Sequence, residues 1–135
     1  MSDSAESVAR AFVGAINRQD AEGLAGLMTP EHRFVDSMGN VVEGREKMRA
    51  AWVGYFRMVP NYSIAADESY SDGAVVVMLG AARGTYAPDG ELRAENRWET
   101  PAAFRAVVED GLVAEWRVYA DNEPMRKLMR QAGCR

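Results

Sequence analysis

The chain has 135 residues, 47% hydrophobic and 27% charged, which is enough for one folded domain with a substantial core. Its net charge of −4 argues against a nucleic-acid partner, and no apolar run approaches the ~20 residues that cross a membrane. One histidine and one cysteine are too few for the usual zinc sites, and the acidic N-terminus does not resemble a signal peptide. We therefore expect a single cytoplasmic domain over residues 1–135, with no metal, nucleic acid or membrane partner.

The first third of the chain predicts two helices. Ser4, or alternatively Ser7, caps a first helix in which apolar residues such as Phe12 recur at spacings of three and four. Asp20 caps a second, shorter helix, which is expected to close at Thr29-Pro30 because proline disfavours a helical residue before it.

A strand, a turn and a third helix are expected next. Residues 32–35 read as a short strand, and Gly39-Asn40 reads as a turn. Gly44 opens a helix over residues 45–57, which Pro60 stops. The inward residues of this helix include Trp52 and Phe56.

The second half of the chain is strand-like. The expected strands cover residues 62–66, 74–85, 92–108 and 112–120, and three Gly-containing turn signatures separate the four of them. Pro101 suggests a bulge or bend, and a last helix is expected over residues 123–132. Helices followed by an antiparallel meander indicate an α+β fold. We expect the helices to pack on one face of a strongly curved sheet, leaving a conical pocket.

Asp36 is the residue that most suggests chemistry. It ends a short apolar run and precedes a glycine turn, with Phe34, Val35 and Met38 around it. If the carboxylate faces inward, its poor solvation suits it to act as a general base or as a polar anchor for a ligand. Aspartate also commonly caps turns, and here the amides of Met38 or Gly39 are within its reach. Both interpretations remain open.

The order of elements resembles the NTF2-like superfamily, within it the SnoaL-like and ketosteroid-isomerase-like proteins. The resemblance covers nearly the whole chain, and its matching stretches are Ala15–Asp20, Phe34–Gly39, Glu43–Glu46 and Glu109–Gly111 leading to Trp116–Asp121. It implies a cystatin-like cone in which N-terminal helices cover a curved, mostly antiparallel sheet. It says little about activity, because this fold carries enzymes of several classes as well as non-catalytic domains.

The catalytic residues of two branches of this superfamily are incomplete here. In ketosteroid isomerases an aspartate base works with an oxyanion hole made of a tyrosine and a protonated aspartate. By resemblance the base falls on Asp36, but the donors fall on Phe12 and Ala103. Losing one such donor typically costs about 100- to 1000-fold in rate, so steroid isomerisation is not expected. The late aspartate of the limonene-epoxide-hydrolase branch falls on Val118, which disfavours that chemistry too.

The remaining candidates are ligand-contacting residues. Phe12, Trp52, Phe56 and Trp116 line a cavity by resemblance, although ordinary core packing explains them equally well. Glu99 could supply a second polar group or acid in that cavity, or could face solvent and pair with an arginine of a neighbouring strand. His32 is interpreted as a surface histidine or a hydrogen-bonded core histidine.

These observations predict a protein that binds a small hydrophobic organic molecule. It is either a cofactor-free isomerase or lyase with Asp36 as general base, or a non-catalytic ligand-binding or dimerisation module. The outer face of the last two strands carries polar and aromatic side chains, and the resemblance implies a homodimer through it. The residues concerned are Arg105, Glu115, Arg117 and Tyr119.

Overall fold

The structure is a computed structural model that describes residues 4–133. Its helices are α1 (Ala5–Asn17), α2 (Ala21–Gly26), α3 (Arg45–Met58), α4 (Glu123–Gly133) and a short 3₁₀ turn at Ala94–Asn96. Its strands are β1 (Met28–Val35), β2 (Val41–Glu43), β3 (Ser63–Asp72), β4 (Val75–Thr85), β5 (Arg97–Glu109) and β6 (Leu112–Ala120).

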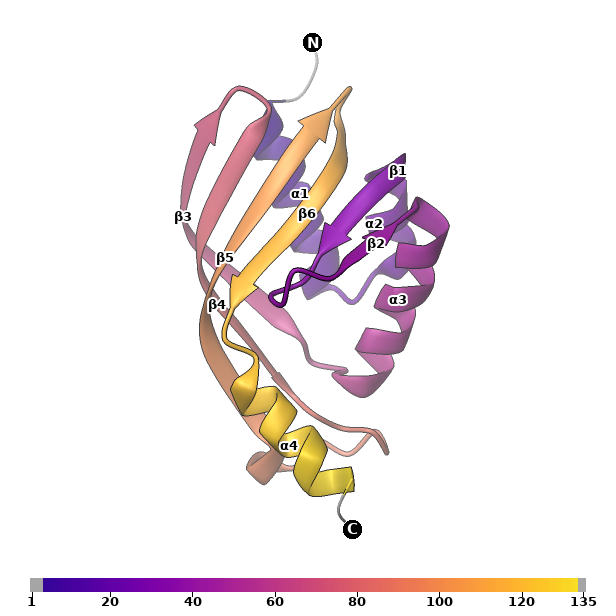
Figure 1. Ribbon diagram of the computed structural model, residues 1–135, viewed down its shortest axis with the longest axis vertical. Coiled ribbons are helices and arrows are strands. Elements are labelled where there is room, and N and C mark those ends of the chain that lie inside the picture. The colour runs from indigo at the N-terminus through magenta and orange to yellow at the C-terminus, as the bar shows by residue number, and fades with distance from the viewer. Residues whose placement is uncertain (1–3, 134–135) are drawn as a thin grey trace.

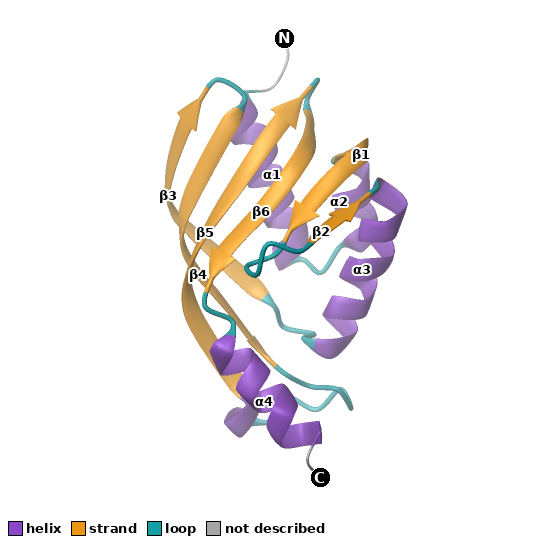
Figure 2. Cartoon of the chain, viewed as in Figure 1, coloured by secondary structure: helices purple, strands orange, loops and turns teal. Residues whose placement is uncertain are grey.

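The six strands form one sheet in the order β2-β1-β6-β5-β4-β3. Every neighbouring pair is antiparallel except β1 and β6, which run parallel. The sheet is strongly curved, with α1, α2 and α3 on one side of it and α4 following β6 at one end (Figures 1 and 2). The expected α+β fold with a curved, mostly antiparallel sheet is confirmed.

Local signals fix the helix starts as the sequence predicts. The Ser4 hydroxyl accepts a hydrogen bond from the amide of Ser7 at 3.1 Å, and the Asp20 carboxylate accepts one from the amide of Gly23 at 2.9 Å. Each bond satisfies an amide that the first helical turn leaves unpaired. Gly44, with φ of 107°, permits the sharp entry into α3.

Pairing between distant strands overrides two local predictions. Thr29-Pro30 does not close α2 but lies within β1, because Met28 pairs with Val113 of β6. Pro101 causes no register shift in β5, where it pairs with Ala81 of β4. Pro101 lies just outside the stretch of β5 that also pairs with β6. The amide hydrogen that proline lacks is therefore not missing from a part of the strand that is paired on both sides.

A bulge in β6 decides which of its side chains face inward. The register between β5 and β6 shifts by one residue at Val107/Val108, so that Ala114 has no partner on β5. As a result both Val113 and Trp116 are buried, although they are three residues apart. Without the bulge, strict alternation would place them on opposite faces of the sheet.

His32 is fully buried in β1 rather than lying at the surface. Its Nδ1 lies 2.7 Å from the carbonyl oxygen of Val113, which makes Nδ1 the protonated nitrogen of the neutral ring. Nε2 is buried without a hydrogen-bond partner among the described residues. Burial lowers the pKa of this imidazole below its ordinary value of 6.5.

We therefore expect acid to destabilise the fold through His32. The unfolded chain takes up a proton near pH 6.5, whereas the folded chain resists it, so stability is complete above about pH 6.5 and falls below it. Protonation of His32 lowers the free energy of unfolding by up to about 1.4 kcal/mol for each unit that the pH falls, until the pKa of His32 in the folded state is reached. Urea unfolding at several pH values between 7.5 and 5 measures it. His32→Gln should flatten this part of the profile, and an equally steep profile in that variant would assign the effect to other groups.

Candidate functional site

A cavity of about 220 Å³ lies between α3 and the concave face of the sheet, near the start of α4. Its lining comes from elements far apart in the sequence, and most of it is apolar. Small and aliphatic side chains are contributed by Met48, Ala51, Ala82, Val118 and Ala120. The aromatic side chains are Phe34, Trp52, Tyr55, Tyr62 and Trp98.

The aromatic side chains form one continuous wall. Neighbouring ring centroids are 4.9 Å apart for Tyr55 and Tyr62, 6.0 Å for Tyr62 and Trp98, and 6.1 Å for Phe34 and Trp52. The Tyr55 ring is almost perpendicular to those of Trp52 and Tyr62, at 89° in each case. The wall is therefore folded rather than flat, so that a ligand meets rings of different orientation.

Helix α1 holds the Tyr62 side of this wall in place. The Gln19 side-chain amide, just after α1, donates to the carbonyl oxygen of Tyr62. Asn17 bonds Ile64 of β3 through both its amide nitrogen and its carbonyl oxygen, at 3.0 and 2.8 Å. The stretch Ala15–Asp20 that carries part of the family resemblance therefore positions the backbone around Tyr62.

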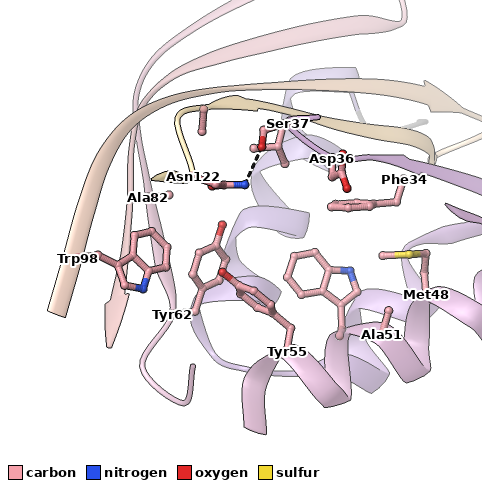
Figure 3. A pocket seen from close by; sticks show the side chains of 13 residues that line it. Phe34, Asp36, Ser37, Met48, Ala51, Tyr55, Tyr62, Ala82, Trp98 and Asn122 are labelled. Carbon is pink, nitrogen blue, oxygen red and sulfur yellow. Dashed lines mark hydrogen bonds between the residues drawn. The ribbon is translucent and has the colours of Figure 1, made fainter. Parts of the chain in front are cut away.

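Two phenols belong to the wall, and both stay protonated at neutral pH because burial raises the pKa of Tyr55 and of Tyr62 above the ordinary value. The Tyr55 hydroxyl donates to the sulfur of Met125 on α4 at 3.6 Å. The Tyr62 hydroxyl has no such bond to another described residue, and Figure 3 shows it pointing toward the side of the cavity that carries Asn122. Tyr62 is thus a donor available to a ligand.

Asp36 lies at the polar rim of the cavity, opposite the phenols (Figure 3). Its Oδ1 accepts hydrogen bonds from the amides of Met38 and Asn40, each at 2.9 Å, and its Oδ2 accepts from the Asn40 side chain at 3.1 Å. The interpretation of Asp36 as a turn-capping residue through Met38 is confirmed. The same carboxylate is half-buried and is the only charged side chain that lines the cavity among the described residues.

Ser37 and Asn122 complete the polar rim. The Asn122 side-chain nitrogen donates to the Ser37 hydroxyl oxygen at 2.6 Å, which connects the turn after β1 to the segment before α4. The carbonyl oxygen of the Asn122 side chain and the hydroxyl hydrogen of Ser37 are not used in this bond. The rim therefore presents both an acceptor and a donor besides the carboxylate.

Of the aromatic residues expected at the cavity, Trp52 lines it and the others do not. Phe56 stacks on Trp52 from behind, with ring centroids 5.3 Å apart. Phe12 and Trp116 pack against each other in the core, 4.7 Å apart, because the inward side of α1 lies over this part of β6. Core packing thus explains Phe12 and Trp116, and Phe56 supports the wall without facing the cavity.

Glu99 does not face the cavity, contrary to the expectation that it could supply an acid there. Its side chain is 62% exposed and pairs with Arg83 on the neighbouring strand at 3.6 Å. Residues alternate along β5, so that Trp98 and Thr100 are buried whereas Glu99 and Ala103 are not. The same alternation means that Ala103, the position expected for the oxyanion acid, also points away from the interior.

The sequence reasoning missed most of the polar and aromatic residues that line the cavity. Tyr55 follows Trp52 by three residues on α3, a spacing that shares a helix face and could have indicated it. The apolar alternation in β5 could have placed Trp98 inward. Ser37, Tyr62 and Asn122 carry no local signal, because only the folded chain brings their three loops together.

The outer face of the sheet carries the polar residues expected there. Arg105 and Glu115 form an ion pair at 2.7 Å on neighbouring strands, and the Arg117 guanidinium lies 4.9 Å from the centre of the Tyr119 ring. Dimerisation through this face stays a prediction. Within residues 4–133 there is no helix long and apolar enough to cross a membrane, and no group of acidic, histidine or cysteine side chains suited to a metal ion.

Comparisons with known proteins agree on the fold. A model of the SnoaL-like domain matches residues 9–116. Comparison with the curated proteins gives no significant match. A protein assigned as a SnoaL-like polyketide cyclase from Shewanella denitrificans OS-217 is similar in structure, with a TM-score of 0.79 and 14% identity over 94% of this chain and 97% of that one.

Two further solved structures show how varied the proteins with this fold are. An epoxide hydrolase of M. tuberculosis that resembles limonene epoxide hydrolase has a TM-score of 0.76 and 18% identity, over 93% of this chain and 90% of that one. A protein from Catenulispora acidiphila DSM 44928 with a ketosteroid-isomerase-like fold, in complex with trimethylamine, has a TM-score of 0.71 and 18% identity, over 83% of each chain. At these identities the likeness concerns the fold alone.

Proposed function

Because the chain belongs to the SnoaL-like domain family, we propose that it binds a small, largely apolar organic molecule in the cavity and acts on it as a cofactor-free isomerase or lyase. The observation that carries the proposal is the cavity itself, in which one carboxylate at the rim faces an aromatic wall that includes the Tyr62 phenol, which has no hydrogen-bond partner among residues 4–133. Apolar cavities with a few convergent polar groups are the usual form of small-molecule sites.

The proposed chemistry is proton transfer next to a carbonyl group. Asp36 accepts a proton from the carbon beside the carbonyl, and the Tyr62 phenol donates a hydrogen bond to the carbonyl oxygen, where negative charge collects. Return of the proton to another carbon completes an isomerisation, and loss of a leaving group from the enolate completes an elimination. The phenol suits this role because burial raises its pKa and keeps it protonated.

A non-catalytic binding module is the second candidate, and the hydrogen bonds of Asp36 favour it. The three bonds from Met38 and Asn40 engage both carboxylate oxygens within the turn, so fewer of their lone pairs are left to take a proton from a substrate. The donors that ketosteroid isomerases use are also absent, since Phe12 and Ala103 stand at those positions. Under this alternative the protein holds the same ligand without changing it.

Exchange of the acidic C–H hydrogens of ketones in D₂O tests the two candidates. We expect wild-type protein to accelerate this exchange in a one- or two-ring ketone, and Asp36→Asn to lower the acceleration by about 100-fold or more, the usual contribution of a general base. Proton NMR follows both the exchange and the binding. The outcome that selects the non-catalytic module is binding, seen as shifted protein resonances, without any exchange above buffer.

Tyr62→Phe provides the companion variant, since it removes the hydroxyl and keeps the ring. A neutral hydrogen bond contributes about 0.5–1.5 kcal/mol, so ketone affinity should fall by about 2- to 12-fold. Glu99→Gln is the matched control for Asp36→Asn, because it removes the same charge from a carboxylate outside the cavity. If no ketone binds to the wild-type protein, the proposed proton transfer next to a carbonyl group is wrong.

A further inference from the structure

We infer that the ligand of this cavity carries a methylated ammonium group, held against the aromatic wall and opposite the Asp36 carboxylate. The inference rests on the binding part of the proposed function and holds for either a catalytic or a non-catalytic site. It names the chemical class of the ligand from the charge, the ring composition and the size of the cavity.

The charge of the cavity favours a cation. Asp36 is its only charged lining residue, and no arginine, lysine or histidine lines it within residues 4–133. An anionic ligand would therefore be repelled by the carboxylate, with no cationic side chain in the lining to offset the repulsion. A neutral ligand leaves that charge without a counter-ion, whereas a cation supplies one.

The aromatic wall favours the same charge. The faces of aromatic rings carry partial negative charge and attract a cation that lies within about 6 Å of the ring centre. Here Trp52, Tyr55, Tyr62 and Trp98 are neighbours with centroid distances between 4.9 and 6.4 Å, so a small cation at the wall lies close to several rings. Tryptophan and tyrosine are the rings that attract cations most strongly.

The mostly apolar and aromatic lining favours a methylated rather than a primary ammonium. A primary ammonium has three N–H donors to satisfy. At the rim, the Asp36 oxygens already accept bonds from Met38 and Asn40. A fully methylated ammonium needs no hydrogen bonds and buries its methyl groups against the rings. A second part of the ligand that carries an oxygen can then accept a hydrogen bond from the Tyr62 phenol.

The size of the cavity sets an upper limit on the ligand. Its volume of about 220 Å³ is below the range of roughly 300–1,000 Å³ typical of sites for drug-sized ligands. A trimethylammonium group on a short oxygen-containing chain is compatible with this volume, whereas a four-ring skeleton needs a larger one.

The decisive comparison is between choline and 3,3-dimethyl-1-butanol, which replaces the quaternary nitrogen of choline by carbon and is otherwise alike in shape. We expect choline to bind the wild-type protein at least about 10-fold more tightly than the neutral compound. Isothermal titration or protein NMR at constant ionic strength measures both affinities. Equal binding of the two compounds, or tighter binding of the neutral one, would overturn the inference.

Two variants test whether Asp36 causes the preference for choline over the neutral compound. Asp36→Asn should reduce the choline preference to less than about 3-fold, because it removes the charge while the side-chain oxygen can still accept the turn amides. Glu99→Gln should leave the preference unchanged, and an equal loss in both variants would attribute the effect to net charge and refute the inference. If one- or two-ring ketones bind and choline does not, the inference fails while the proposed function stands. If neither binds, the proposed function fails as well.

Discussion

Trp116→Ala is expected to lower the free energy of unfolding by about 3–5 kcal/mol, the range found when a large buried aromatic side chain is removed. Trp116 is 1% exposed and packs between Phe12 and Phe104, with ring centroids 4.7 and 5.6 Å away. Both neighbours are themselves fully buried, so the surrounding core cannot collapse into the space without losing other contacts.

Urea unfolding followed by circular dichroism measures this loss. Trp116→Phe is the matched control, because it keeps a ring between Phe12 and Phe104 and should cost less than the alanine variant. Since Trp116 does not line the cavity, Trp116→Phe should also leave the affinity for a bound probe within about threefold. A loss below about 1 kcal/mol in the alanine variant would contradict the assignment of Trp116 to the core.

Gly80→Ala is expected to cost about 3 kcal/mol of stability or more, at the upper end of the range for overpacking. Gly80 lies on β4 next to the register shift of β3 between Ala66 and Glu68. A β-carbon at Gly80 would lie 1.8 Å from the carbonyl oxygen of Ala65, which is backbone and has no rotamer by which to move away. The two strands would have to separate at this position.

Gly54→Ala provides an internal control for this effect. Gly54 is an exposed residue inside α3, and a β-carbon there would meet nothing within 4 Å. We therefore expect the free energy of unfolding of this variant to rise by about 0.5–1 kcal/mol, because alanine is a better helix former than glycine. Thermal and urea unfolding of both variants measure these changes in stability. If Gly80→Ala were as stable as the wild type, the close approach of β3 and β4 described here would be wrong.

The sequence predicts elements well where the determining interactions are local. Ser4, Asp20 and Gly44 mark helix starts through bonds or backbone angles within four residues of themselves. Both predicted ends of the strand over residues 112–120 are confirmed. They are predictable because a glycine turn precedes the strand and a helix cap follows it. Patterning of this kind also made the α+β class and the antiparallel meander predictable, whereas the strong curvature of the sheet was implied by the family resemblance.

Alternation in β5 shows how a correct local pattern can be assigned to the wrong face. Glu99 and Arg105 have the same parity in the strand, and Arg105 was expected on the outer face. The same parity therefore places Glu99 outside, where it pairs with Arg83. The expectation that Glu99 enters the cavity depends on aligning one position of this strand with a family motif by counting residues. That count depends on the lengths of the turns, which the sequence does not fix.

The candidate site divides in the same way between local and tertiary determinants. From the sequence alone, Asp36 could be identified as a polar residue in an apolar setting followed by a turn, and Trp52 as an inward residue of its helix. The cavity itself depends on contacts between distant segments, because Tyr62, Trp98 and Asn122 meet only after the sheet has curved. The tertiary structure also assigned Phe12 and Trp116 to the core, since the bulge at Ala114 and the position of α1 over β6 decide which rings touch. Sequence periodicity reports which face of an element is buried, whereas packing between elements decides whether that face fills a core or lines a cavity.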